Sequence, residues 1–152
     1  MAYAERTTVT AERSLGEMRE LLSKHGCTHF AYGSSPEGDV IQFRLNERHY
    51  RMDVVRPTWD EVRKKFADPR RADQKAAVAG EWRRRWRARV LWLKATLEFA
   101  ENSQDIARML MAYSLLPDGR TLEKALDGSI EEWYLTGKMP PLLGTGLDIG
   151  KD

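Results

Sequence analysis

One stretch near the middle of the chain decides the fold: Val40-Ile41-Gln42-Phe43-Arg44-Leu45-Asn46-Glu47-Arg48-His49-Tyr50-Arg51-Met52-Asp53-Val54-Val55. Apolar and polar residues alternate on both sides of Asn46-Glu47, which is the pattern of two strands that bury one face. Asn46-Glu47 makes a tight connection, and Pro57 ends the second strand because proline cannot donate to a sheet ladder. The inward residues are expected to be Ile41, Phe43, Leu45, Tyr50, Met52 and Val54.

A third strand is predicted just before this stretch. Thr28, Phe30 and Tyr32 alternate with smaller or polar residues, and residues 34–39 have the composition of a hairpin loop. Three such strands in succession form an antiparallel meander with one apolar and one polar face.

Helical spacing flanks the predicted meander on both sides. Before it, a helix is expected from Thr10 or Ser14 to about His25, with Gly26 in the position of a left-handed C-cap. After it, Thr58 caps a short helix that carries Val62 and Phe66, and Asp68-Pro69 interrupts that helix. Asp73 then caps a long helix that runs to about Glu101, and shorter helices follow Asn102, Thr121 and Ser129.

Two apolar stripes run along the long helix. One holds Trp82, Trp86, Val90, Leu93, Leu97 and Ala100, and the other holds Ala88, Leu91, Trp92, Ala95 and Phe99. A helix with two apolar stripes contacts two layers. It is therefore expected at the centre of the fold, between the sheet and the C-terminal helices.

These elements predict an α+β fold: a three-stranded antiparallel meander packed on a long central helix, with additional C-terminal helices. Residues 1–10 are expected to form an N-terminal arm and residues 11–136 a single domain. Residues 137–152, which contain Pro140-Pro141 and, after them, Gly144, Gly146 and Gly150, are expected to form an extended tail.

Composition narrows the classes of function. The 152 residues suit one domain, and the single cysteine excludes an internal disulfide framework and a cysteine-based zinc site. The sequence has no run of 18 apolar residues and no apolar core of a signal peptide near its first residue. A cytoplasmic protein with no membrane partner is therefore expected.

The charge is unevenly distributed along the chain. The whole sequence has 25 Lys+Arg and 23 Asp+Glu, a net charge of +2. Residues 44–94 hold sixteen basic and seven acidic residues, a net of +9, which leaves −7 for the rest. Arginine outnumbers lysine seventeen to eight, and arginine presents a flat fork to phosphate. A folded surface with a positive patch is expected from this block.

No pattern of catalytic residues is present, so no catalytic residue and no cofactor is expected. His25, Cys27 and His29 lie close in sequence but change structural context within five residues, which does not favour a metal site. Asp60-Glu61 is explained by the first turn of a helix. The protein is therefore expected not to be an enzyme, with a metal-dependent nuclease as the third alternative.

The most unusual local sequence is Trp82-Arg83-Arg84-Arg85-Trp86-Arg87-Ala88-Arg89. Arginines interleaved with tryptophans combine phosphate-pairing charge with stacking rings, which is typical of single-strand nucleic-acid binding. Trp82 and Trp86 are also four residues apart on one apolar stripe, as core tryptophans would be, and that interpretation is favoured for them. The arginines would then cover the stripe with their stems and keep their charges in water.

The sheet adds to the predicted basic surface. Its polar face should show Arg44 and Arg51, and this face beside the arginine-rich helix would form a groove that follows phosphates. The candidate nucleic-acid-binding residues are Arg44, Arg51, Arg83, Arg84, Arg87 and Lys94. Because the sheet aromatics point inward, backbone contacts with low sequence preference are expected, to single or double strands. Such a protein would assist recombination, annealing or replication.

A protein–protein interaction module is the alternative. A basic half and an acidic half also suit head-to-tail homo-oligomers. Such a protein would dock on a host or phage complex, or inhibit a defence system.

The predicted order of elements is similar to two known topologies. The order helix, three-stranded meander, long helix resembles double-stranded RNA-binding domains, and the meander with its long helix is similar to the core of single-strand annealing proteins. Gln74-Lys75-Ala76-Ala77 departs from the lysine-rich helix start of the first group. Fold resemblance alone does not determine function.

A second likeness lies in short phrases from about residue 6 to 143. They resemble a family of small uncharacterised proteins of bacteriophages and prophage-bearing bacteria, which implies one compact domain and a phage context. The phrases are Thr28-His29-Phe30-Ala31-Tyr32-Gly33, Trp86-Arg87-Ala88, Leu93-Lys94-Ala95-Thr96-Leu97-Glu98, Leu116-Pro117-Asp118-Gly119-Arg120-Thr121 and Gly137-Lys138-Met139-Pro140-Pro141-Leu142-Leu143.

Overall fold

The computed structural model describes residues 7–139, and its first element is helix α1 (Ala11–Lys24). Of the two predicted starts, Thr10 is the N-cap, because its hydroxyl oxygen accepts a hydrogen bond from the Arg13 amide at 3.2 Å. Gly26 follows the helix with φ +88, the left-handed conformation predicted for it. Residues 1–6 of the predicted arm and 140–152 of the predicted tail lie outside the described residues.

The predicted meander is confirmed. Strands β1 (His29–Ser35), β2 (Gly38–Leu45) and β3 (Arg48–Val55) pair antiparallel in the order β1-β2-β3. Phe43 pairs with Phe30 on one side and Tyr50 on the other, so the expected apolar side chains share one face. The first hairpin is tighter than predicted, because the strands extend to Ser35 and Gly38. Asn46 and Glu47 both have positive φ, as a two-residue hairpin turn requires.

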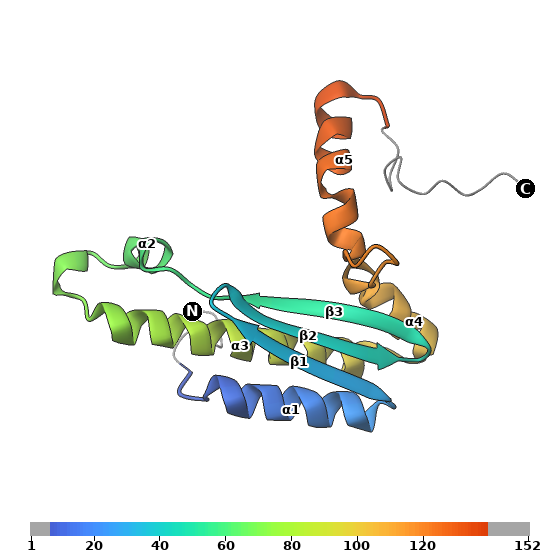
Figure 1. Ribbon diagram of the computed structural model, residues 1–152, viewed down its shortest axis with the longest axis horizontal. Helices are drawn as coiled ribbons and strands as arrows, with labels where there is room; N and C mark the ends of the chain where they lie inside the picture. The colour runs from blue at the N-terminus through green and yellow to red at the C-terminus, as the bar shows by residue number, and fades with distance from the viewer. Residues whose placement is uncertain (1–6, 140–152) are drawn as a thin grey trace, which may run out of the picture.

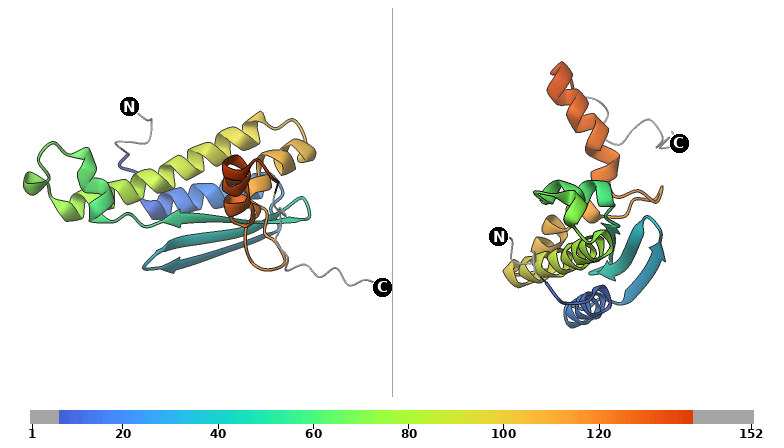
Figure 2. Two further views of the ribbon diagram at one scale, coloured as in Figure 1. Left: turned by 90° about the horizontal axis from the view of Figure 1, so that it is seen from above. Right: turned by 90° about the vertical axis from the view of Figure 1, so that its left-hand side faces the viewer.

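Helices α1 and α3 (Gln74–Phe99) cover the apolar face of the sheet (Figure 1), and both views of Figure 2 show them on the same side of it. The side chain of Asp73 caps α3 by accepting from the Ala76 amide at 3.1 Å. Trp86 and Leu93 of the first stripe are completely buried. The core thus forms between the apolar sheet face and two helices, from Met18, Leu22, Ile41, Phe43, Leu45, Tyr50, Met52, Val54, Trp86, Val90, Leu93, Leu97, Ile106 and Leu110.

The connection between β3 and α3 occupies one end of the molecule (Figure 1). It contains α2 (Trp59–Val62) and two 3-10 turns, η1 (Arg63–Lys65) and η2 (Pro69–Arg71). Phe66 lies just after η1 and is exposed, whereas the sequence placed it on the short helix with Val62. Its backbone is extended there, so the apolar spacing does not continue as a helix.

The C-terminal part differs from the prediction in two respects. After α4 (Ser103–Met109) and η3 (Met111–Tyr113), a single helix α5 (Leu122–Thr136) replaces the two expected helices. The Ser129 capping pattern lies inside α5, because Thr121 caps the helix and its backbone ladder continues past Ser129. Helix α5 also projects from the domain (Figures 1 and 2) and does not cover α3. Between residues 7 and 139, no helix has both the length and the apolar character to cross a membrane.

Candidate nucleic-acid interface

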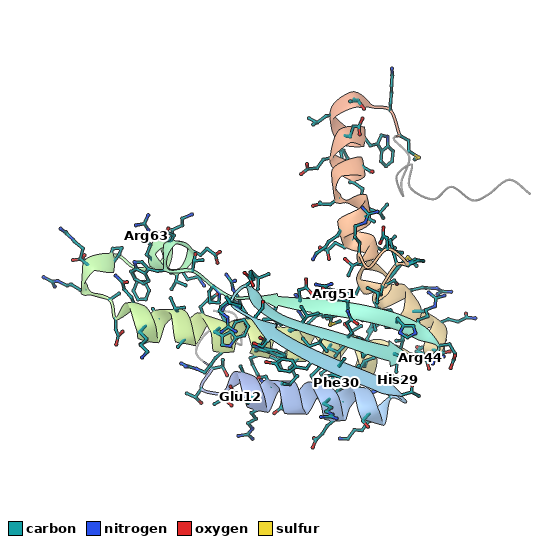
Figure 3. All side chains as sticks on the ribbon, viewed as in Figure 1. Glu12, His29, Phe30, Arg44, Arg51 and Arg63 are labelled. Carbon is teal, nitrogen blue, oxygen red and sulfur yellow. The ribbon has the colours of Figure 1, made fainter. Side chains whose placement is uncertain are left out.

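Arg44 and Arg51 lie on the open face of the sheet, as predicted (Figure 3). Each is paired with a nearby carboxylate: Arg44 with Glu47, and Arg51 with Asp53 at 2.9 Å. Lys124 of α5 also reaches Asp53, at 3.0 Å. Burial would raise the pKa of Asp53, but hydrogen bonds from Arg51 and Lys124 outweigh it and lower that pKa. This face is therefore less positive than its arginines alone suggest.

The arginines of α3 surround a buried carboxylate of the same helix. The side chain of Glu81 is almost completely buried and accepts two hydrogen bonds from Arg84, both at 2.8 Å. Arg85 donates to it at 3.2 Å and Lys65 at 3.1 Å. The hydrogen bonds from Arg84 are the main cause that lowers the pKa of Glu81 to about 2. This part of the basic block is paired with an acid of its own fold.

Other cations of α3 tie the helix to its neighbours. Arg87 pairs with Glu17 of α1, and Arg83 Nε donates to the Thr7 carbonyl oxygen at 3.5 Å. Lys94 is exposed and has no polar partner within residues 7–139. Of the six candidate residues, five therefore have internal partners and Lys94 has none in that range.

The six residues do not form one surface, which corrects the expected groove. Arg44 and Arg51 alternate with the apolar residues of β2 and β3, so they point to the face opposite the one on which α3 packs. The helix occupies the apolar face because that is where burial stabilises it. A groove that combines the sheet arginines with the helix arginines is therefore not formed.

A different basic surface is present at the end of the molecule, which we call the basic end and define as residues 56–75. It holds seven cations and four carboxylates. Arg70 and Arg71 are 93% and 89% exposed and share one carboxylate, Asp68, at 3.5 and 3.6 Å. Lys64 and Lys75 are exposed and have no ion pair among the described residues. Figure 3 places Arg63 of this surface far from Arg44.

The basic end also contributes to an aromatic pocket. Trp59 and Trp82 line a pocket of about 570 Å³ with Arg56 and Lys75 on its wall. The guanidinium of Arg56 lies 4.3 Å from the centroid of the Trp82 ring, and its buried Nε has no hydrogen-bond partner. Trp59 lies 6.1 Å from the exposed Phe66 ring. The pocket therefore offers flat apolar surfaces and positive charge within one site.

This pocket gives a second contact to one of the two tryptophans that the sequence placed in the core. Trp86 is a core residue as expected, whereas Trp82 is only partly buried. Trp82 precedes Trp86 by one turn, packs against the core and also lines the pocket. Trp59, Arg70 and Arg71 were not predicted as site residues, although a net of +3 with two aromatics over residues 56–75 was a signal for them.

Among the described residues, no group of three or more His, Cys, Asp or Glu is placed so that it could hold a metal ion. Comparisons of the sequence with protein-family models and curated proteins, and of the fold with solved structures, find no match. Function is therefore inferred from the geometry of the chain itself.

Proposed function

We propose that the protein is a non-catalytic, phage-type nucleic-acid-binding protein that holds its ligand at the basic end. The observation that supports this is a group of exposed, weakly compensated cations in the same segment that supplies Trp59 and Lys75 to the pocket of Trp59 and Trp82. Replication, recombination and annealing are the processes that such a protein would assist.

Phosphate contacts would come from the four most available cations of this surface. Arg70 and Arg71 compete for one carboxylate, so an approaching phosphate supplies a second anion without breaking a buried ion pair. The arginine fork is suited to two phosphate oxygens. Lys64 and Lys75 add charge with no internal partner in residues 7–139.

The aromatic pocket favours single strands. In a duplex the faces of the bases are already stacked on one another, whereas an unpaired base can stack on an exposed ring. Trp59 and Trp82 provide such rings, and Arg56 adds a cationic plane over one of them. Stacking accepts every base, so sequence preference should be low. This adds base contacts to the backbone contacts that the sequence predicted.

The test is fluorescence anisotropy with labelled single- and double-stranded oligonucleotides of equal length, at two salt concentrations. The full chain should bind single strands more tightly, and binding should weaken steeply with salt because each phosphate contact releases counterions. The double variant Arg70→Gln, Arg71→Gln should lose about tenfold in affinity and show a shallower salt slope. Absence of binding at low salt would refute the proposal.

The matched control is the double variant Arg108→Gln, Arg120→Gln. It removes the same charge from two exposed arginines outside the basic end, each of which pairs with one aspartate. Its affinity should equal that of the unaltered chain. An equal loss in both double variants would mean that net charge alone, and not this site, drives binding.

A protein–protein interaction module is the second candidate, and one observation favours it. No residue of α5 is buried, and Ile130, Trp133, Tyr134 and Leu135 are exposed. If interaction is the function, Trp133→Asp should abolish assembly, and the variant lacking Arg70 and Arg71 should assemble normally. The first candidate is supported instead if Trp133→Asp leaves oligonucleotide affinity unchanged and the variant lacking Arg70 and Arg71 loses affinity.

A further inference from the structure

Helix α5 presents an apolar stripe that nothing in the described chain covers. Leu126, Ile130 and Trp133 recur at helical spacing on one side of it. Ile130 and Trp133 are both more than 40% exposed, and Tyr134 beside them is 83% exposed. A large exposed apolar patch on a helix marks an interaction surface.

A second stripe, on α3, is only partly covered. The sequence predicted that Ala88, Trp92, Ala95 and Phe99 would pack under the C-terminal helices; Tyr113 of η3 contacts Trp92, with ring centroids 5.2 Å apart, but α5 does not cover the stripe. Phe99 is 76% exposed and Trp92 is 38% exposed. The α5 stripe spans about two turns of helix and the α3 stripe about three. Each therefore offers the other an apolar surface to bury.

The charges favour docking of α5 on α3 over the pairing of two α5 helices. Residues 122–136 hold four acids and one lysine, a net of −3. The arginines in the first half of α3 are largely paired within the chain, and residues 88–99, which carry the stripe, hold Arg89, Lys94 and Glu98, a net of +1. Two α5 helices would repel each other, whereas α5 on α3 brings opposite charges together.

Hydrogen bonds hold the segment that leads into α5, and the helix points away from α3 of the same chain. The Leu115 amide donates to the His49 carbonyl oxygen of β3 at 2.9 Å, and the Leu122 amide donates to the Ser114 carbonyl oxygen at 2.9 Å. The ion pair between Lys124 and Asp53 adds a third link. Folding α5 back onto its own chain would break these contacts, so the stripe is free for another molecule.

We infer that α5 docks on the α3 stripe of a second copy of this chain, with Trp133 and Ile130 of one protomer against Trp92 and Phe99 of its partner. The exchange is reciprocal, so each protomer provides one α5 and accepts one, as a two-fold dimer requires. This inference does not depend on nucleic-acid binding.

The test is the oligomeric state of the full chain, measured by sedimentation velocity over a range of concentrations. A dimer is expected. The donor variant Ile130→Asp, Trp133→Asp and the acceptor variant Phe99→Asp should each raise the dimer dissociation constant at least tenfold. The control is Leu135→Asp, which changes a residue 87% exposed on the opposite side of α5 and should dimerise normally.

Mixing the donor and acceptor variants distinguishes this reciprocal α5–α3 arrangement from other modes of dimerisation. An equimolar mixture of donor and acceptor variants retains one intact α5–α3 contact, so it should form heterodimers although each variant alone is monomeric. Circular dichroism checks that both variants are folded. A monomeric wild-type chain would overturn the inference, and so would a dimer that Phe99→Asp leaves intact or a mixture that stays monomeric. None of these outcomes bears on oligonucleotide affinity, which is measured separately.

Discussion

Nε1 of Trp86 donates a hydrogen bond to Oδ2 of Asp39 across 3.1 Å, which links the middle of α3 to the start of β2 inside the core. Asp39 is only 4% exposed. It also accepts from the hydroxyls of Tyr32, at 3.1 Å, and Ser34, at 2.7 Å. One buried carboxylate therefore joins two strands and the long helix, and the guanidinium of Arg56 lies 3.5 Å from it.

Removing this carboxylate should destabilise the fold. Asp39→Ala leaves three donors and a cation without their acceptor, and we expect a loss of about 3 kcal/mol in the free energy of unfolding. Asp39→Asn keeps one acceptor oxygen for Trp86 and should lose less. Urea unfolding followed by circular dichroism measures both. Equal stability of Asp39→Ala and the wild type would contradict this network.

Because of Glu81, the free energy of unfolding should decrease as the pH becomes acidic. Its pKa is about 2 in the fold, against an ordinary value of 4.5. A lowered folded pKa stabilises the protein fully above the unfolded pKa, and that contribution disappears as the pH falls from about 4.5 toward 2. The shift corresponds to about 3 kcal/mol.

Glu81→Gln tests this dependence. At pH 7 it should be less stable than the wild type by roughly that amount, and the difference should shrink as the pH approaches 2. The control is Glu98→Gln, an exposed position on the same helix, which should follow the wild-type curve. A constant difference between Glu81→Gln and wild type from pH 7 to 2 would argue against the proposed ion cluster.

Gly38 is required where β2 begins. Its φ is +150, and a Cβ there would lie 2.2 Å from the Val54 carbonyl oxygen. That oxygen belongs to the backbone of β3, so it cannot move without disturbing the sheet. We expect Gly38→Ala to destabilise the protein by about 3 kcal/mol or more. Thermal unfolding measures the change.

Gly16 is the matched control for this substitution. It lies on the exposed side of α1, and a Cβ at this position would meet nothing within 4 Å. Gly16→Ala should raise stability by up to about 1 kcal/mol, because alanine favours a helix over glycine. Destabilisation by both variants alike would point to a general intolerance of larger residues and not to the close approach at β3.

Trp59 should contribute to single-strand binding and not to duplex binding. Trp59→Ala removes one ring from the pocket, and loss of a base stack corresponds to about a tenfold loss in affinity. Duplex affinity should change less than twofold. Trp133→Ala, which removes an exposed ring from α5, should leave both affinities unchanged. Anisotropy with the same oligonucleotides measures this, and a parallel loss for duplexes would contradict base stacking.

The sheet could be predicted closely because its signal is local. Residues 41–45 and 50–54 alternate strictly, and a shift of one residue would turn Phe43 and Tyr50 to solvent. Helix starts could also be predicted, since Thr10, Thr58 and Asp73 are caps whose hydrogen bonds join residues three apart in sequence. These features need no knowledge of distant parts of the chain.

The candidate site could not be predicted to the same degree, because it depends on contacts between distant residues. The pairing of Arg87 with Glu17 spans seventy positions, and the burial of Asp39 depends on Trp86. Charge counts treat every arginine as available, and only tertiary structure shows which ones already have an acid. The same holds for Trp82, which packs against the core as its spacing predicts but also lines a pocket that only the tertiary structure shows.

The helix arginines should therefore contribute to stability more than to nucleic-acid affinity. Arg87→Gln breaks the ion pair between α3 and α1 and should lower the free energy of unfolding by about 1 kcal/mol. Its oligonucleotide affinity should stay within twofold of wild type, the opposite of the result expected for Arg70 and Arg71. Glu17→Gln should have a similar effect on stability.

A double-mutant cycle of these two positions isolates the pair. If Arg87 and Glu17 stabilise each other, the double variant is less destabilised than the sum of the single variants, by about 0.5 kcal/mol or more. Urea unfolding at low and high salt gives this coupling, and salt should weaken it because the pair is partly exposed. This interpretation would be contradicted if the two single substitutions were strictly additive and Arg87→Gln lost much of its oligonucleotide affinity. Arg87 would then belong to the nucleic-acid-binding surface that the sequence predicted.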